Sequence, residues 1–497
     1  MWPFKKSRSQ DDSRQRWPLS LALLQLSDHD VFTLADACEG VQTLGGTGSG
    51  KSSGSGRCFA LSYLNAGMGG LVLTAKADER RTWEEYCRET GRSGDLLIMS
   101  PAEALRFNFL DYELHRSGPG GGLTENLVNI FSEVLEVAER QTGSSGREDE
   151  GYWRRASRQL VRNAIDLLIF GRGSVSIPDL YRVIVSLPTS LEQVNSDAWK
   201  QSSFAFSCLQ SADAAAKSAM RRRDFELCTD YLLLEYPALS EKTRSIIVST
   251  ITSLIDVLQR STLRELFCTT TNVTPEATTQ GKILLIDLPV KEYLDVGRIS
   301  QVLMKYIFMR SIEHRPFSED MRPVFLWADE SQFFTSKYDH IFQSTARSSR
   351  VATVYLTQNI SNYLATLGAD ETGKAGVDSL LANLNTKIVH ANGDPVTNEW
   401  CAELIGRSRQ FFVNASQSRS PDLVSALIGL GSDLQNSSGI SEVMEYEVSP
   451  RVFTTLRKGG VANQGIVDAI VFQGGRRFRA SGKTWLRTTF QQRLTSR

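Results

Sequence analysis

Paired cysteines are absent from this sequence. Its seven cysteines are scattered through 497 residues, and none stands in a C-x-x-C pattern. This scatter argues against a disulfide framework and against a zinc site, and it is typical of free thiols in a reducing compartment. We therefore expect a cytoplasmic protein without structural zinc.

An excess of one charge is absent too. Lysine and arginine together number 56, and aspartate and glutamate together also number 56. The overall charge therefore gives no indication of a nucleic-acid partner, and any basic surface must be local.

Long apolar runs are also missing. No run approaches the ~18 to 20 residues that a membrane-spanning helix requires. The longest early candidate, 19–26, is short and contains Ser20 and Gln25. We expect no integral membrane segment and no signal peptide.

Residues 1–30 are expected to form a basic N-terminal tail. Cationic and aromatic side chains share its first half, namely Trp2, Phe4, Lys5, Lys6, Arg8, Arg14, Arg16 and Trp17. We favour a disordered, solvated tail, because such a segment buries too little apolar surface to fold. The alternative is contact with nucleic acid or with anionic lipid, which would place the protein peripherally at the inner face of the cell membrane.

What the sequence does contain is a glycine-rich phosphate-binding pattern, G-x-x-x-x-G-K-[ST], after a short strand-like run at 41–44. The residues concerned are Gly45, Gly46, Thr47, Gly48, Ser49, Gly50, Lys51, Ser52 and the adjoining Ser53. Backbone N–H groups of such a loop point at a triphosphate, while Lys51 would reach the β- and γ-phosphates and the Ser52 hydroxyl would hold Mg²⁺. The pattern predicts ATP and Mg²⁺ as cofactors; a flexible Ser/Gly turn is the alternative.

The remaining chain divides by its periodicity. Residues 31–115 and 281–497 alternate short apolar runs with helical stretches, which predicts parallel strands joined by crossovers. Residues 116–280 have helical periodicity and few strand signals. We therefore predict an α/β fold, a RecA-like P-loop NTPase core with a mostly parallel sheet, into which an all-helical domain is inserted.

Three arginines share one stripe of a helix predicted at 152–170: Arg154, Arg158 and Arg162. A solvated polar face is the favoured interpretation, and a contact surface for nucleic acid or a partner protein is the alternative.

Two strand-like runs lead to an aspartate, 283–287 and 324–330. Nucleotide hydrolysis needs one carboxylate to organise Mg²⁺ and a second to polarise the attacking water. Only Asp329 and Glu330 supply both, because Asp287 is followed by Leu288 and Pro289. We predict Asp329 as the metal ligand, Glu330 as the base, and Asp287 as a structural strand end.

The next predicted strand, 351–357, ends at Gln358. An amide at a strand tip beside the Asp329–Glu330 strand can sense the γ-phosphate or hold the water, so Gln358 completes a RecA-type hydrolysis site at the carboxyl ends of the strands.

Such sites often gain a cation from a neighbouring subunit, which stabilises the charge on the transferring phosphoryl group. Arg350 and Arg407 are the main candidates for this role, with Arg347 as a third. The sequence does not choose among them.

Several ordered segments carry a resemblance to a known family. Besides the phosphate loop they are Arg-Phe-Asn-Phe-Leu-Asp at 106–111, Trp-Ala-Asp-Glu-Ser-Gln at 327–332, Tyr-Leu-Thr-Gln-Asn at 355–359, and parts of 393–407. The set resembles the TraG/TraD coupling ATPases of type IV secretion and conjugation, which are related to TrwB and to the FtsK/HerA DNA motors. It is more specific than the phosphate loop alone, because few NTPases share the whole ordered set.

The resemblance implies a homo-hexameric ring that hydrolyses ATP to translocate DNA, expected to be single-stranded, or to deliver a DNA–protein substrate. Its implied partners are a relaxase or secretion-channel proteins. Many members begin with transmembrane helices, which this chain lacks, so a soluble FtsK/HerA-like translocase in genome maintenance or defence stays open. A nucleotide-gated platform that recruits proteins without moving DNA is the other alternative.

The C-terminal segment is basic and aromatic. After Asp468 it has no acidic residue, and its cations and aromatics are Phe472, Arg476, Arg477, Phe478, Arg479, Lys483, Trp485, Arg487, Phe490, Arg493 and Arg497. We favour a pair of edge strands with outward arginines and inward aromatics. Binding of single-stranded DNA is the alternative.

Overall fold

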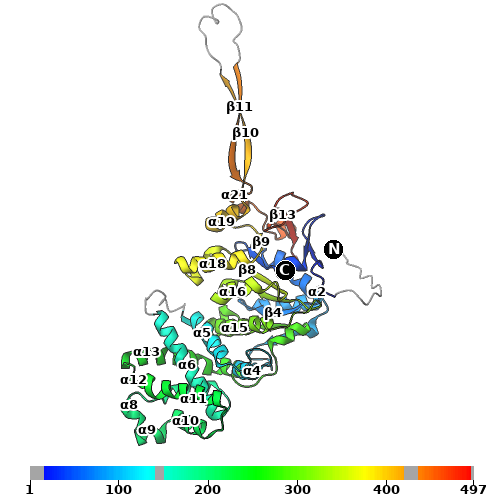
Figure 1. The fold of residues 1–497 in the computed structure, drawn as a ribbon. Helices are drawn as coiled ribbons and strands as arrows, with labels where there is room; N and C mark the ends of the chain where they lie inside the picture. Colours follow the sequence, from blue (N-terminus) through cyan, green and yellow to red (C-terminus); the bar gives the residue numbers. More distant parts are fainter. Residues whose placement is uncertain (1–15, 140–149, 419–434, 494–497) are drawn as a thin grey trace, which may run out of the picture.

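The structure is a computed structural model that describes residues 16–139, 150–418 and 435–493. Its centre is a nine-stranded sheet in the order β13-β12-β9-β3-β8-β7-β4-β6-β5, seen edge-on in the middle of Figure 1. In chain order the strands are β3 (Val41–Leu44), β4 (Gly69–Leu73), β5 (Leu96–Met99), β6 (Ile283–Ile286), β7 (Val324–Ala328), β8 (Val351–Thr357), β9 (Thr386–Val389), β12 (Ile466–Gln473) and β13 (Trp485–Gln491). The seven strands from β9 to β5 pair in parallel, and β12 pairs antiparallel with both of its neighbours, β9 and β13. The predicted α/β class with a mostly parallel sheet is confirmed.

The sheet is buried on both faces, which is why its strands are continuous apolar runs. Successive side chains of a strand point to opposite faces. In β7, Phe325 and Trp327 therefore join one apolar core, while Val324, Leu326 and Ala328 join the other.

Helices cover both faces. The Phe325 side is covered by α1 (Leu34–Cys38), α2 (Arg57–Asn65) and α3 (Asp78–Glu89). The Leu326 side is covered by α15 (Val290–Glu313), α16 (Lys337–Thr345), α17 (Ile360–Leu367), α18 (Glu371–Asn383) and α19 (Pro395–Ile405). On the first face, the Trp83 ring of α3 stacks on Phe325 with centroids 5.6 Å apart and packs edge-on against Trp327.

Between β5 and β6 the described residues of 116–280 form helices and no strand. After α4 (Phe109–His115) they are α5 (Thr124–Glu139), α6 (Glu150–Arg172), α7 (Ile177–Val185), α8 (Leu191–Val194), α9 (Asp197–Ser202), α10 (Phe204–Ala214), α11 (Ala219–Asp230), α12 (Tyr236–Ala238), α13 (Glu241–Gln259) and α14 (Ser261–Phe267). They lie together at one side of the sheet core (Figure 1). The limits 116 and 280 of an inserted domain remain our proposal.

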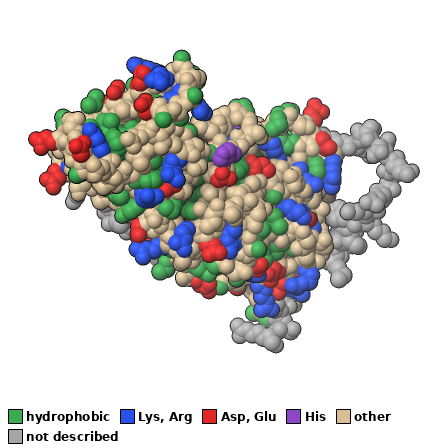
Figure 2. All heavy atoms as spheres, turned by 90° about the horizontal axis from the view of Figure 1, so that it is seen from below, with side chains coloured by type: hydrophobic (Ala, Val, Ile, Leu, Met, Phe, Trp, Pro, Cys, Tyr) green, Lys and Arg blue, Asp and Glu red, His purple; other side chains and the backbone are tan. Residues whose placement is uncertain are grey.

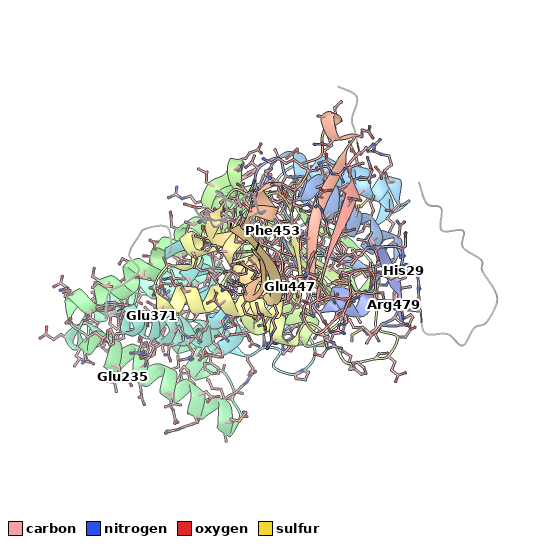
Figure 3. The ribbon with its side chains drawn as sticks, turned by 90° about the horizontal axis from the view of Figure 1, so that it is seen from above. His29, Glu235, Glu371, Glu447, Phe453 and Arg479 are labelled. Carbon is pink, nitrogen blue, oxygen red and sulfur yellow. The ribbon has the colours of Figure 1, made fainter. Side chains whose placement is uncertain are left out.

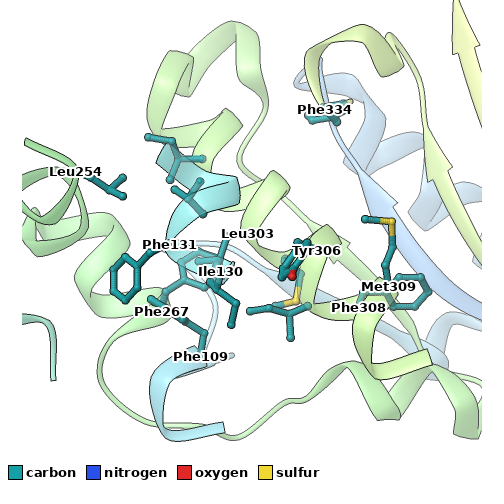
Figure 4. Close-up of a cluster of buried hydrophobic side chains, with 14 of the residues drawn as sticks. Phe109, Ile130, Phe131, Leu254, Phe267, Leu303, Tyr306, Phe308, Met309 and Phe334 are labelled. Carbon is teal, nitrogen blue, oxygen red and sulfur yellow. The ribbon is translucent and has the colours of Figure 1, made fainter. Parts of the chain in front are cut away.

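One continuous apolar cluster joins this helical segment to the sheet core. Phe131 of α5 and Phe267 of α14 lie beside Leu303 and Tyr306 of α15 (Figure 4). The helical segment therefore packs onto α15, and this contact removes apolar side chains of both from water.

The arginine stripe of α6 faces α5. Arg158 and Arg162 both donate to the carboxylate of Glu125, at 2.5 and 2.8 Å, and Arg154 lies 3.8 Å from Glu136. The charges of the stripe therefore join two helices, although its side chains are still 32 to 40% exposed. Periodicity could not reveal this, since Glu125 belongs to another helix.

The tail predicted for 1–30 is wrong for its described part. Residues 22–25 form β1 (Ala22–Gln25), which pairs antiparallel with β2 (Val31–Thr33). Trp17 is only 5% exposed, and its indole N–H donates to the Ala66 carbonyl at 3.1 Å. Apolar burial against α2 outweighs the ordering cost here; residues 1–15 lie outside the described residues.

The C-terminal segment forms the predicted pair of edge strands, with β13 outermost. Phe490 is buried, and Arg487 donates to the Asp468 carboxylate at 2.8 Å. In the connecting turn, the Arg479 amide donates to Asp30, and Figure 3 shows Arg479 close to His29. These bonds fasten the segment to the N-terminal hairpin.

A long hairpin was not expected. β10 (Arg407–Ser418) and β11 (Gln435–Tyr446) pair antiparallel along their whole length and project from the core beyond α19 and α21 (Pro450–Thr454) (Figure 1).

Among the described residues, no single helix is long and apolar enough to cross a membrane; α13 and α14 pass that test only together, across a bend of 79°. All seven cysteines are free thiols.

Candidate nucleotide-binding site

The sheet order brings the predicted site residues to one edge. β3, β8, β7 and β4 are consecutive neighbours and run parallel, so the loops that follow them meet at the carboxyl end of the sheet. These loops carry the phosphate loop, Gln358, the Asp329–Glu330 pair and Lys76, respectively.

The phosphate loop adopts a conformation that its glycines permit. Gly48 and Gly50 have φ values of +71° and +88°, a region that other residues rarely occupy. A Cβ at Gly50 would also lie 2.6 Å from a methyl carbon of Val467. The glycines are therefore required by the backbone and by its packing.

The start of the loop is bonded to neighbouring strands. The Gly45 N–H donates to the Thr357 carbonyl at 3.3 Å, and the Gly46 N–H to the Ala391 carbonyl at 2.9 Å. These two amides anchor the loop, whereas the pattern predicted that they contact nucleotide. Ser49 is buried, and at the far end the Ser53 hydroxyl accepts a 2.6 Å bond from Gln492.

Lysine, serine and both carboxylates of the prediction lie together. The Ser52 hydroxyl donates to Asp329 Oδ2 at 2.6 Å, and Lys51 Nζ lies 3.4 Å from Glu330 Oε1. Lys51 is 7%, Asp329 7% and Glu330 3% exposed. Such burial of charged groups is costly unless they are paired, so the cluster points to a built site.

Glu330 has φ +49°, in the left-handed region that a non-glycine residue seldom enters. This conformation turns the chain sharply after β7, immediately before a short 3₁₀ turn at Ser331–Phe333. The carboxylate of Glu330 is thereby brought back toward the phosphate loop, a strained arrangement of the kind found at functional sites.

Two lysines control the ionisation of Glu330. Burial opposes its ionisation, but Lys51 and Lys76 outweigh burial and lower the pKa of Glu330 to about 2. Glu330 is therefore a carboxylate at any pH near neutrality, and it can accept a hydrogen bond from water.

Gln358 connects the loop to the carboxylate. Its Oε1 accepts from the Thr47 hydroxyl at 3.2 Å, and its Nε2 donates to Glu330 Oε1 at 3.3 Å. A side-chain amide can do both at once, because it carries an acceptor oxygen and a donor nitrogen. Gln358 is thus in contact with both parts of the site, as its position at a strand tip predicts.

Three residues were missed as members of the site. Lys76 lies 3.1 Å from Glu330 Oε1, and Gln332 donates to Glu330 Oε2 at 3.2 Å. His390, after β9, contacts the Ser55 hydroxyl at 2.7 Å behind the phosphate loop. The available signal was position: Lys76 and His390 both follow the carboxyl end of an apolar run, but neither belongs to a motif.

His390 is fully buried, and burial lowers its pKa to about 4. It is therefore neutral near pH 7. Its Nδ1 lies 2.9 Å from the Asp468 carbonyl, so the proton sits on Nδ1 and Nε2 accepts from Ser55. The ring thus supports the helix that begins after the phosphate loop.

The arginine candidates lie elsewhere. Arg350 is buried at the start of β8, the end of the strand away from the loop, and its guanidinium donates to the carbonyls of Trp17, Met321 and Glu319. Its burial within its own subunit, away from the phosphate loop, argues against the predicted role. Arg407 is exposed at the base of the β10–β11 hairpin, where Glu403 and Tyr446 bind it.

Mg²⁺ fits the residues present. Ser52 and Asp329 already place two oxygen ligands of the kind Mg²⁺ prefers in contact, and this ion is usually completed by phosphate oxygens and water rather than by a full protein cage. The described residues contain no group of three or more His, Cys, Asp or Glu that could hold a metal.

Sheet order, phosphate loop and carboxylate pair define this protein as a RecA-like P-loop NTPase by fold. Solved structures of the conjugative coupling protein TrwB have that fold too. TrwB with the ATP analogue ADPNP is 15% identical, with a TM-score of 0.56 and coverage of 95% of this chain and 90% of that one. TrwB with ADP and Mg²⁺ is 14% identical, with a TM-score of 0.55 and coverage of 96% and 92%.

The unbound TrwBΔN70 form, at 14% identity and a TM-score of 0.54, covers 95% of this chain. No protein-family model and no curated protein matches the sequence. The resemblance expected from the motifs is thereby confirmed at the level of the fold.

Proposed function

We propose that this protein is a Mg²⁺-dependent ATPase that forms a homo-hexameric ring and uses hydrolysis to translocate DNA, or a DNA–protein substrate, toward a type IV secretion apparatus. The observation that carries the proposal is the convergence of Lys51, Ser52, Asp329, Glu330 and Gln358. The fold shared with a conjugative coupling protein supports the choice of substrate.

Each residue has a role in this proposal. Lys51 and the loop amides hold the phosphates, and Ser52 and Asp329 hold Mg²⁺, which would neutralise charge on the phosphate oxygens. Glu330 orients the water that attacks the γ-phosphorus as the bond to the ADP oxygen breaks, and Gln358 reports whether the γ-phosphate is present. Arg407 remains the candidate cation from a neighbouring subunit.

DNA should stimulate hydrolysis if the ATPase is a DNA motor. We expect the steady-state ATPase rate at low salt to rise with single-stranded DNA more than with double-stranded DNA, and to vanish when EDTA removes Mg²⁺. Low salt matters because phosphate-backbone contacts weaken as salt rises. A rate that neither DNA form changes would contradict translocation.

A protein-docking platform is the second candidate. The helical segment exposes apolar side chains at Val185, Leu191, Met220, Leu227 and Leu234, which suits a protein partner. On the face seen in Figure 2, Lys and Arg alternate with Asp and Glu, so no extended basic surface is visible there. Stimulation by a partner protein but not by DNA would favour this candidate.

A further inference from the structure

Lys76 is a charged residue near Glu330 that no motif predicts. It follows β4, and β4 pairs in parallel with β7 so that Leu73 lies opposite Ala328. The residues just after each strand are therefore neighbours, and Lys76 comes beside the Asp329–Glu330 pair.

The ammonium group of Lys76 is shared between the two carboxylates. Its Nζ lies 3.1 Å from Glu330 Oε1 and 3.8 Å from Asp329 Oδ2. The same Oε1 has Lys51 at 3.4 Å and Gln358 at 3.3 Å. Glu330 thus has two cationic partners on one oxygen.

The backbone that carries Lys76 is firmly held. The Glu79 carboxylate accepts from the N–H groups of Ala75 and Lys76, at 3.0 and 3.2 Å. One residue earlier, Gln301 bonds both the N–H and the carbonyl of Thr74. The backbone of Lys76 is therefore fixed, and only its side chain can change the distance between the ammonium group and Glu330.

The two lysines differ in what ATP would do to them. Lys51 belongs to the phosphate loop, so nucleotide binding would draw its ammonium group toward the phosphates. Glu330 is almost fully buried, and a buried carboxylate that loses its cation is strongly destabilised. Lys76 is the cation that remains.

This inference rests on the proposed function. We propose that Lys76 is the positioning residue for Glu330: its ammonium group holds the carboxylate in place when ATP engages Lys51. Lys76 touches neither the bond that forms nor the bond that breaks. Lys76 therefore contributes to kcat and not to the affinity for ATP.

The test compares Lys76→Gln with Lys76→Arg, using Lys282→Gln as the matched control. Lys282 pairs with Asp95 at 3.0 Å, away from the site. We expect Lys76→Gln to lower kcat about 100-fold, as misplacement of a reacting group does. KM and the Kd for a fluorescent ATP analogue should stay within about threefold, because Lys76 has no assigned contact with the nucleotide.

Lys76→Arg should recover most of the activity, and Lys282→Gln should match the unmodified protein. In a Glu330→Gln background, Lys76→Gln should lower kcat no further, because the two residues act as a unit. A structural role for Lys76 would instead add to the Glu330 loss.

Three results would overturn the assignment: unchanged kcat in Lys76→Gln, a loss of ATP affinity equal to that of Lys51→Ala, or additive losses in the double variant. Absence of hydrolysis by the unmodified protein would overturn the proposed function and this role with it. That outcome is distinguishable, because it appears before any variant is compared.

Discussion

Replacing Glu330 by Gln is expected to leave ATP binding intact while kcat falls by about 10²- to 10⁴-fold, the range for loss of a positioned general base. Glutamine has nearly the same shape and can keep contacts near Lys76 and Gln358, but it cannot accept a proton from the attacking water. Steady-state ATPase assays and titration with a fluorescent ATP analogue measure the two effects separately.

Two further variants serve as controls for this experiment. Lys51→Ala should lose nucleotide affinity as well as turnover, because it removes the cation expected on the phosphates. Glu103→Gln should behave like the unmodified protein, since Glu103 pairs with Arg80 outside the site. Full turnover by Glu330→Gln would remove Glu330 as the base.

Replacing Lys305 by Met should cost about 3 to 5 kcal/mol of unfolding free energy, the effect of leaving one buried charge unpaired. Lys305 of α15 and Asp339 of α16 form an ion pair in which both side chains are 0% exposed. Lys305 Nζ also donates to the Phe334 carbonyl at 2.7 Å, and Asp339 accepts from the Ser336 N–H at the start of α16. Urea denaturation of the purified variant measures the loss.

The matched control is Arg260→Met, which removes an exposed pair with Asp256 and should leave the denaturation midpoint unchanged. Adding Asp339→Leu to Lys305→Met should recover part of the loss, because the unpaired charge disappears. If Lys305→Met unfolds at the same urea concentration as the unmodified protein, the buried pair is not what holds α16 against α15.

The core of the site could be predicted because its chemistry is local in sequence. The phosphate loop is one continuous pattern, and Asp329 and Glu330 are adjacent, so spacing alone identified them. Asp287 was set aside on the same local grounds, and the structure pairs it with Arg80 at 3.0 Å, as a strand-end residue. Gln358 could be predicted from its position at the tip of an apolar strand.

Lys76 and His390 could not be assigned to the site from sequence, because each joins it through a neighbouring strand. Gln332 stood inside the 327–332 segment, but the sequence assigned it no role. The same limit applied to the α6 arginines, whose partner Glu125 lies on another helix, and to Trp17, which packs beside Ala66. The sequence made Arg350 a plausible candidate for the cation from a neighbouring subunit, but in the structure its guanidinium donates to three carbonyls. Pairing between distant segments depends on the order of the strands in the sheet, and the periodicity of the sequence does not predict that order.

By itself, the sequence determined the class of fold, the two-faced burial of the parallel strands and which residues are candidates to hold phosphate and Mg²⁺, because residue type and spacing dictate backbone conformation and ligand chemistry over short range. The tertiary structure alone decided which charges meet: that β4 lies beside β7, that Lys76 therefore shares Glu330 with Lys51, and that Arg158, Arg162 and Arg350 bind carboxylate and carbonyl groups of the protein itself. Strand order sets those distances, and electrostatic pairing in a buried site depends on distance.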